Sequence, residues 1–312
     1  KKRIVKEINS YATIPTLTQF LENNGQDIRI LYQGSNCWSS LKRAAGRITY
    51  ADDAVTKRLE KGMANLIHHN TASFLRFVER FIAGEEVHKV EANKTYAIML
   101  YYALFQDKIS KTGYESINEA LELIHLPKYA CFKQEIAEIV SYLLSRLDIK
   151  TTPIGAEIIP GLELYGCYTR EEVFTLVGRQ TAEVKMQGTA SGAFNLPEHN
   201  AVLLFVTLNK SEKDFSPSTQ YNDYLINDEY FHWQSKNTDS HYNSGGRKYI
   251  EQPKTGIKII LFVREEKKDG FGNTSPFHCF GLVDYVSSHD DFPMNVKWKL
   301  QKPAMAQYLK AI

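Results

Sequence analysis

The residues best suited to chemistry gather between positions 215 and 249. Eight of these 35 residues are aromatic, nearly twice the 12% of the whole chain, and short polar side chains stand between the rings. Flat apolar faces beside hydrogen-bonding groups are what a pocket for a nucleobase or a similar flat ligand requires. The same composition fits the aromatic-rich core of a small β domain with polar loops. The stretch therefore predicts either a flat-ligand pocket or a core.

Standard catalytic signatures are missing from the sequence. It contains no GxxxxGK[ST] phosphate loop, HExxH helix, GxSxG elbow, dinucleotide fingerprint or HxKxxxxD arrangement. Glu265 and Lys267 form an ExK triplet after an expected strand, as in metal-dependent nucleases, but Asp269 follows the triplet rather than preceding it. The run EEKKDG is also typical of a charged hairpin tip. We expect no catalytic residue and no enzyme activity in this chain, with a metal-dependent nuclease domain as the alternative.

Metal ligands are not expected from the local spacing either. The adjacent His68 and His69 have no acidic or cysteine neighbour at metal-binding distance along the chain, so a surface or capping role is predicted. The cysteines stand singly, which excludes a zinc ribbon and indicates buried, reduced thiols. They are Cys37, Cys131, Cys167 and Cys279. We therefore expect no metal and no cofactor in the chain.

Helices are predicted for residues 1–150. Apolar residues recur three and four apart, and glycines or a proline separate the periodic segments. The predicted helices cover 51–69, 71–83, 95–106, 116–125 and 128–147. Residues 1–150 should thus form an all-helical domain.

The character of the chain changes after residues 148–161, which hold two prolines and two glycines. A capping box at Thr169–Glu172 opens one further helix, which Gly178 should end. Runs of strand composition follow at 201–208, 229–234, 256–264, 278–286 and 294–300, before a short helix at 304–309. The fold class is therefore α+β: the helical domain precedes a β-rich domain at 151–312, with a curved sheet or partly open barrel and a few short helices.

Composition and charge limit the possible partners. The chain has 43% hydrophobic and 24% charged residues, a net charge of +2 and no apolar run long enough to span a membrane. Residues 1–150 hold 21 basic and 17 acidic residues, and residues 151–312 hold 17 and 19. Neither half has the uniform positive charge of a nonspecific nucleic-acid binder. The chain begins at Lys1, so we expect a segment of a longer, cytoplasmic protein.

Several motifs of the second half resemble one bacterial C-terminal domain. They are YTREEVFTLVG (168–178), TLNKSEKDFSPSTQYNDY (207–224), FHWQS (231–235), ILFVRE (260–265) and FGLVDYV (280–286). The domain follows a phospholipase D-like nuclease and a superfamily 2 helicase-type ATPase, an arrangement that looks like SauUSI-type restriction enzymes. These modification-dependent, type IV enzymes cleave DNA that carries 5-methylcytosine or 5-hydroxymethylcytosine. The resemblance covers about residues 162–309 and is weaker over the helical half.

The resemblance implies an SRA-like (PUA-like) reader that flips a modified base into a pocket. Double-stranded DNA with modified cytosine would then be the partner, together with the nuclease and ATPase domains of the parent protein. ATP and magnesium would belong to that bacterial parent. The remaining alternative is an interaction module that docks on the ATPase without contacting bases.

The pocket residues follow from the chemistry of a flipped cytosine. Asp223 is expected to accept from the N4 amino group, where thymine presents a carbonyl. The ring walls would be Tyr221 with Tyr224 or Phe231 with Trp233, and the polar edge would come from Thr219, His232, Gln234 or Ser235. Alternatively, Tyr221 and Trp233 are core, Asp223 caps a turn and His232 is an ordinary strand histidine.

Basic residues outside this pocket are candidates for contact with the DNA backbone. They are Arg179, Lys185, Lys236, Arg247 and Lys248.

Overall fold

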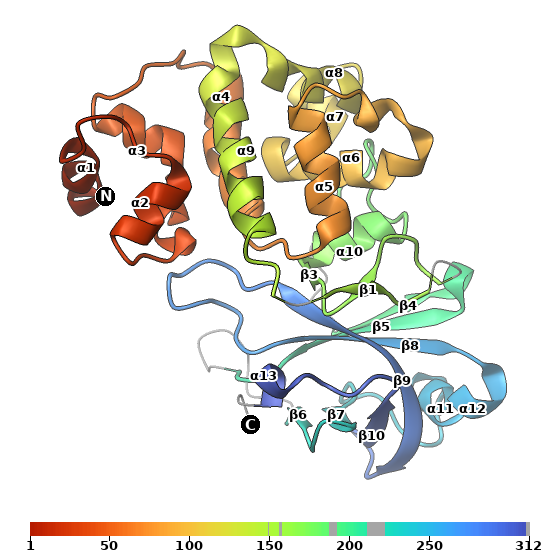
Figure 1. Ribbon diagram of the computed structural model, residues 1–312. Coiled ribbons are helices and arrows are strands. Elements are labelled where there is room, and N and C mark those ends of the chain that lie inside the picture. The colour runs from red at the N-terminus through yellow and green to blue at the C-terminus, as the bar shows by residue number, and fades with distance from the viewer. Residues whose placement is uncertain (149, 156–157, 187–191, 211–221, 310–312) are drawn as a thin grey trace. The chain divides into compact units, whose positions relative to one another are not determined.

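The computed structural model describes residues 1–148, 150–155, 158–186, 192–210 and 222–309 (Figure 1). The chain forms two compact units. The helical unit contains Lys1–Thr151, Arg170–Gln187 and Gly270–Asn273, and the sheet unit contains Thr152–Thr169, Gly188–Asp269 and Thr274–Ile312. The sequence predicted two contiguous domains that meet at residue 150. The two units are not contiguous in sequence, because residues 170–187 and 270–273 pack with the helices.

Side-chain caps start several helices of the helical unit. Thr16 and Asp53 each form a capping box, with Gln19 and Thr56 respectively as the reciprocal partner, and Ser116 accepts from the backbone N–H of Glu119. The helices are α1 (Lys2–Asn9), α2 (Leu17–Asn23), α3 (Trp38–Ala44), α4 (Ala54–Gly62), α5 (Ala72–Ile82), α6 (Lys94–Phe105), α7 (Ile109–Thr112), α8 (Ile117–Glu122), α9 (Ala130–Leu144) and α10 (Arg170–Leu176).

Helix α6 is the central helix of this unit. Every residue from Ala97 to Phe105 is buried, and α6 contacts α4, α5, α8 and α10. The predicted helix at 51–69 is wrong in its length, since α4 ends at Gly62 and a 3-10 turn (Met63–Asn65) follows. A Cβ at Gly62 would lie 2.7 Å from the carbonyl oxygen of Ala103. The glycine thus allows α4 to approach α6 closely.

The sheet unit is built on an eight-stranded mixed sheet of order β4-β5-β8-β9-β10-β7-β6, with β3 paired to β9. Strands β5 and β8 are parallel, and the other neighbours along this order are antiparallel. The strands are β1 (Thr152–Pro153), β2 (Glu163–Leu164), β3 (Cys167–Tyr168), β4 (Ala193–Leu196), β5 (Ala201–Thr207), β6 (Tyr224–Leu225), β7 (Tyr230–Gln234), β8 (Lys258–Arg264), β9 (Phe277–His289) and β10 (Asn295–Leu300). Strands β1 and β2 form a separate pair.

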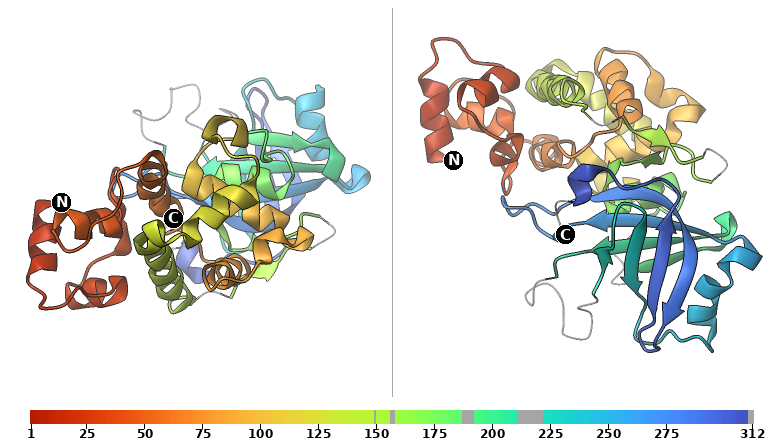
Figure 2. Two further views of the ribbon diagram at one scale, coloured as in Figure 1. Left: turned by 90° about the horizontal axis from the view of Figure 1, so that it is seen from above. Right: turned by 60° about the horizontal axis from the view of Figure 1, so that its bottom comes forward.

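The core of this unit includes one face of β7 and β10 and both faces of β5 and β8. Strands β7 and β10 alternate between buried and more exposed residues, and β5 is buried along its whole length. Figure 2 shows the long β9 beside β10 in the bent sheet, and β7 follows on the other side of β10. Helices α11 (Ser244–Ile250) and α12 (Gln252–Thr255) contact β9, and α13 (Ala306–Leu309) comes last.

The α+β class and a β-rich second part with a few short helices are confirmed. The sheet is not closed into a barrel, because β4 and β6 lie at opposite ends of the strand order. The expected strands at 201–208, 229–234, 256–264, 278–286 and 294–300 correspond to β5, β7, β8, β9 and β10. Among the described helices, none has the length and apolar character to cross a membrane.

Candidate nucleic-acid interface

Two stacked rings lie on the outer face of the sheet, opposite the core. Tyr224 of β6 pairs directly with His232 of β7, and their ring centroids are 4.6 Å apart at an interplanar angle of 14°. Tyr224 is 40% exposed. The pair therefore presents an aromatic ring to solvent in a fixed orientation.

Lysines of β10 extend this face. Lys297 lies directly across from His232, and its ammonium group sits 4.3 Å from the centroid of the Tyr230 ring. Lys299 is opposite Tyr230 and exposed. Tyr224, His232 and Lys297 thus form a row across three neighbouring strands. Sequence reasoning missed both lysines, although their alternation with Val296 and Trp298 already indicated an outward direction.

Hydrogen bonds fix the polar groups of the same face. His232 Nδ1 lies 2.8 Å from the carbonyl oxygen of Asn222, so it carries the proton and leaves Nε2 as the acceptor of the neutral ring. Gln234 accepts from the backbone N–H of Asn222 at 2.6 Å and donates to Asn295 Oδ1 at 2.9 Å. These contacts hold the chain just before β6 against β7 and orient the imidazole.

Asp223 is not open to a base in the structure. Its Oδ2 lies 2.5 Å from Lys210 Nζ, its Oδ1 accepts from the backbone N–H of Gln234 at 2.8 Å, and its side chain is only 3% exposed. Burial raises the pKa of Asp223 above its ordinary value, and the nearby Lys210 opposes this shift. The carboxylate serves an internal contact, which differs from the expected role in reading cytosine N4.

Phe231 and Trp233 are core residues and do not form the walls of an open pocket. Both are buried, and both belong to the cluster that includes Tyr249 and Trp298. Ser235 is also buried, and its hydroxyl accepts from the backbone N–H of Met294 at 3.0 Å. The reason is the two-residue period of β7, which turns these side chains inward and His232 and Gln234 outward. Thr219 and Tyr221 lie outside the described residues.

The five predicted backbone-contact residues do not form one group. Arg179 and Lys185 belong to the helical unit, where Lys185 donates to the Gln106 carbonyl oxygen at 2.5 Å. Lys236, Arg247 and Lys248 belong to the sheet unit, and Lys236 is exposed.

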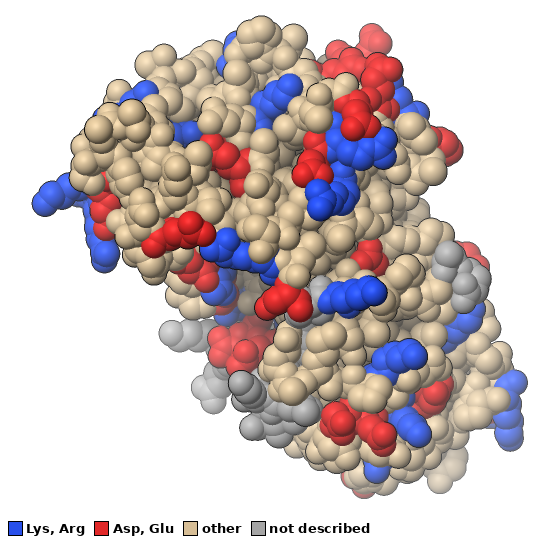
Figure 3. Space-filling view, viewed as in Figure 1, with Lys and Arg blue, Asp and Glu red and all other residues tan. Residues whose placement is uncertain are grey.

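An open groove of about 520 Å³ brings Arg247 and Lys248 together beside Tyr242. Arg247 pairs with Glu251 at 2.5 Å, and Lys248 donates to Asn195 at 2.9 Å. Burial lowers the pKa of Lys248. On the face shown in Figure 3, basic and acidic side chains are interspersed, so the described residues there form no continuous positive band.

Comparison with known proteins finds a match to one family model over part of the chain. Residues 162–311 match the family model described as a domain of unknown function (DUF3427). No curated protein matches the chain. The DUF3427 region includes the Tyr224–His232 face, and it also includes α10, which packs in the helical unit.

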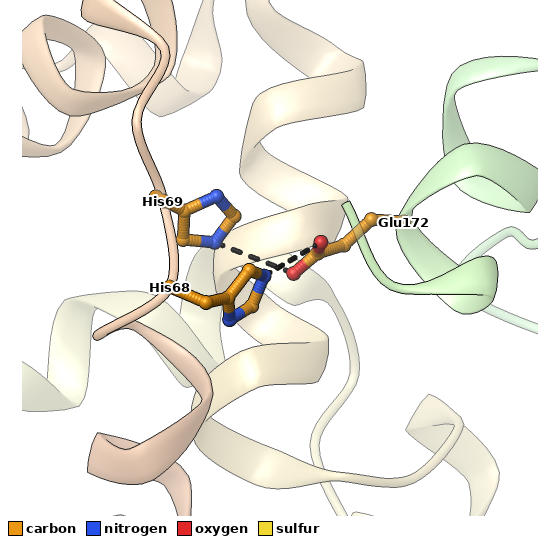
Figure 4. A group of neighbouring side chains, drawn as sticks. All are labelled: His68, His69 and Glu172. Carbon is orange, nitrogen blue, oxygen red and sulfur yellow. Dashed lines mark hydrogen bonds and ion pairs between the residues drawn. The ribbon is translucent and has the colours of Figure 1, made fainter. Parts of the chain in front are cut away.

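A second cluster of ionisable side chains joins residues of the DUF3427 match to the helices. Glu172 of α10 lies between two imidazoles, with Oε2 at 2.9 Å from His68 Nε2 and Oε1 at 3.3 Å from His69 Nε2 (Figure 4). The surface or capping role predicted for this histidine pair is wrong for His69, whose side chain is 1% exposed. The two histidines hold the pKa of Glu172 well below its ordinary value, although burial acts in the opposite direction. Sequence reasoning missed Glu172 because 104 residues separate it from His68.

The alternative nuclease site receives less support. Glu265 follows β8 directly and is exposed in the β8–β9 hairpin connection, where a bridge pairs Lys268 with Thr274. Within the described part of the chain, the three potential metal ligands that converge are His68, His69 and Glu172, and Glu265 does not belong to that group.

Proposed function

We propose that the sheet unit is a DNA-binding reader that recognises a modified cytosine, 5-methylcytosine or 5-hydroxymethylcytosine. The observation that carries the proposal is the exposed Tyr224 ring, stacked on His232 and flanked by Lys297 on one face of the sheet. The motif resemblance to the C-terminal domain of SauUSI-type enzymes supports the choice of ligand.

Stacking gives this face a way to hold a flipped cytosine. Removing a base from the duplex costs a few kcal/mol. Stacking on an aromatic side chain returns roughly 1–3 kcal/mol per base, so the outer face of Tyr224 can offset much of that cost. His232 lies against the opposite face of the Tyr224 ring, so it does not reach a base stacked on the outer face. Its hydrogen bond to the carbonyl oxygen of Asn222 holds the stacked pair in place.

Recognition of the modification needs more than burial of a methyl group. One buried methyl group contributes only about 0.8 kcal/mol, close to a fourfold preference. A stronger preference requires a shaped slot around C5 of the base. A ring or a threonine methyl group has the shape to line this slot.

The reader would serve a larger, ATP-dependent restriction enzyme of the bacterial cytoplasm. In that arrangement the nuclease and the helicase-type ATPase lie in other parts of the parent protein, and ATP and magnesium act there. The chain described here would then be the DNA-recognition part and would carry no reaction of its own.

Titration of the purified chain against three matched fluorescent duplexes tests the proposal. The duplexes carry cytosine, 5-methylcytosine or 5-hydroxymethylcytosine at one central position, and fluorescence anisotropy is read at several salt concentrations. We expect tighter binding to at least one modified duplex. Equal affinity for all three would contradict the reading of the modification, and weak binding to all three would favour the interaction module.

A second measurement separates base reading from backbone contact. Lys297→Gln should weaken binding to every duplex by a similar factor and reduce the salt dependence, because the ammonium group would neutralise a phosphate. His232→Phe keeps a ring against Tyr224 and should bind like wild type, whereas His232→Ala removes the support of the Tyr224 ring and should weaken binding to the modified duplex. Unchanged binding by His232→Ala would show that the stacked pair does not hold the base.

A further inference from the structure

The cluster of His68, His69 and Glu172 in the helical unit has the composition of a metal site. Two imidazoles and one carboxylate are a common donor set of three-ligand zinc sites. The three residues come from two segments: the histidines follow the 3-10 turn Met63–Asn65, and Glu172 belongs to α10. Figure 4 shows the three side chains converging from these segments.

The distances between the ligand atoms suit a tetrahedral ion. Donor atoms that each lie about 2.0–2.2 Å from zinc are roughly 3.3–3.5 Å apart at the tetrahedral angle. Glu172 Oε1 lies 3.3 Å from His69 Nε2, Glu172 Oε2 lies 2.9 Å from His68 Nε2, and one ligand atom of each residue lies within 4.8 Å of the others. Small side-chain rotations are enough to place all three around one ion.

An ordinary buried ion pair explains this geometry less well. His69 is almost fully buried, yet among the described residues neither of its ring nitrogens has a hydrogen-bond partner, and the 3.3 Å contact to Glu172 lacks hydrogen-bond alignment. A buried polar group without a partner destabilises the folded state. A metal ion bonded to Nε2 would supply the missing partner of one nitrogen.

We propose that His68, His69 and Glu172 bind a zinc ion, with water at the fourth position. The described residues place no fourth protein ligand in this group. The ion would join the turn before α5 to α10 and so fasten part of the DUF3427 region to the helical unit. This role is independent of base recognition by the sheet unit.

Metal content of the full, tag-free chain tests the proposal. The protein is loaded with zinc, passed through gel filtration and analysed by mass spectrometry for bound metal, and replacement by cobalt gives a visible spectrum that reports tetrahedral coordination. Wild type should retain one zinc per chain. Glu172→Gln and His69→Ala should each weaken zinc binding by at least about tenfold.

His88→Ala is the matched control. His88 is a buried histidine of the same unit and lies 3.6 Å from Glu122, and the residues that the structure describes place no third ligand beside it. This variant should retain zinc like wild type. Zinc retained equally by all variants, or absent from wild type after loading, would overturn the proposal.

Zinc-dependent melting keeps the test valid if a ligand variant folds poorly. A metal that binds only the native state raises the melting temperature as its concentration increases. Wild type and His88→Ala should show this rise and lose it with a chelator, and His68→Ala, which removes the most exposed ligand, should not. Wild-type melting that does not respond to zinc would overturn the site.

Discussion

Lys210 Nζ lies 2.5 Å from Asp223 Oδ2 inside the sheet unit, and the two side chains are 8% and 3% exposed. Asp223 also accepts from the backbone of Gln234, the last residue of β7. The hydrogen bond holds the chain before β6 against β7, and the ion pair joins the same segment to the chain that follows β5. These contacts position Tyr224, the next residue after Asp223.

Loss of one partner of this pair should destabilise the sheet unit strongly. Lys210→Met leaves the buried carboxylate without its counter-charge, and breaking a buried pair costs about 3–5 kcal/mol. Urea unfolding monitored by tryptophan fluorescence measures this cost. The double variant Lys210→Met with Asp223→Asn keeps the acceptor for Gln234 and removes the charge, so it should recover much of the stability. A double variant as unstable as Lys210→Met would show that the charge is not the cause.

The exposed ring of Tyr224 should matter for DNA and little for folding. Tyr224→Ala removes a stacking surface worth roughly 1–3 kcal/mol, so affinity for modified DNA should fall about 5- to 150-fold. Tyr224→Phe keeps the ring and should bind like wild type. Anisotropy titration and thermal melting measure the two properties separately. Tyr242→Ala is the control, because Tyr242 is 87% exposed but lies by the Arg247 groove.

His278 should make the sheet unit sensitive to acid. Burial lowers the pKa of His278 from 6.5 to about 4, and Nδ1 of the ring lies 3.3 Å from Cys167 Sγ. Above pH 6.5 the imidazole is neutral in both states and contributes nothing to the pH dependence. Between pH 6.5 and 4 the unfolded state binds one proton that the folded state does not bind. The free energy of unfolding therefore decreases as the pH is lowered through this range, by up to about 3 kcal/mol.

The difference between wild type and His278→Gln isolates this contribution, because the other titrating groups are common to both proteins. The free energy of unfolding of the glutamine variant should fall less steeply between pH 6.5 and 4. Parallel pH profiles of the two proteins would contradict the assignment.

Gly62 should not tolerate a side chain. A Cβ there would lie 2.7 Å from the backbone of Ala103 and Leu104, which cannot move without displacing α6. Gly62→Ala should therefore destabilise the helical unit by about 1–3 kcal/mol despite the better helix propensity of alanine. Thermal melting measures the effect. Gly270→Ala, where the added Cβ meets nothing within 4 Å, should change stability little.

The local pattern of apolar and polar residues predicted most of the helices and strands. The strands at 201–208 and 256–264 correspond closely to β5 and β8, because long apolar runs of β-branched residues have few other stable arrangements. The lengths of helices depend on tertiary contacts, and α4 ends where Gly62 meets α6. The periodicity of the chain contains no information about that contact.

The candidate sites were harder to predict. The alternation in β7 separates Phe231 and Trp233 from His232 and Gln234, and the more apolar pair faces the core, but these two rings were interpreted as walls of a pocket. Asp223 looked available because its partner Lys210 stands 13 residues earlier. Glu172 looked like part of a helix cap, and its histidine partners are more than a hundred residues away. Such pairings arise only when the chain folds.

The position of α10 shows that the boundary of the family match differs from the boundary of the compact units. The match to the DUF3427 model begins at residue 162, whereas α10, at Arg170–Leu176, contacts the largely buried α6 of the helical unit. Exchange of the matched region between related proteins would therefore also replace part of the core of the neighbouring unit. A successful chimera would need compatible residues on α6, so the two parts of the chain are expected to evolve together rather than as exchangeable modules.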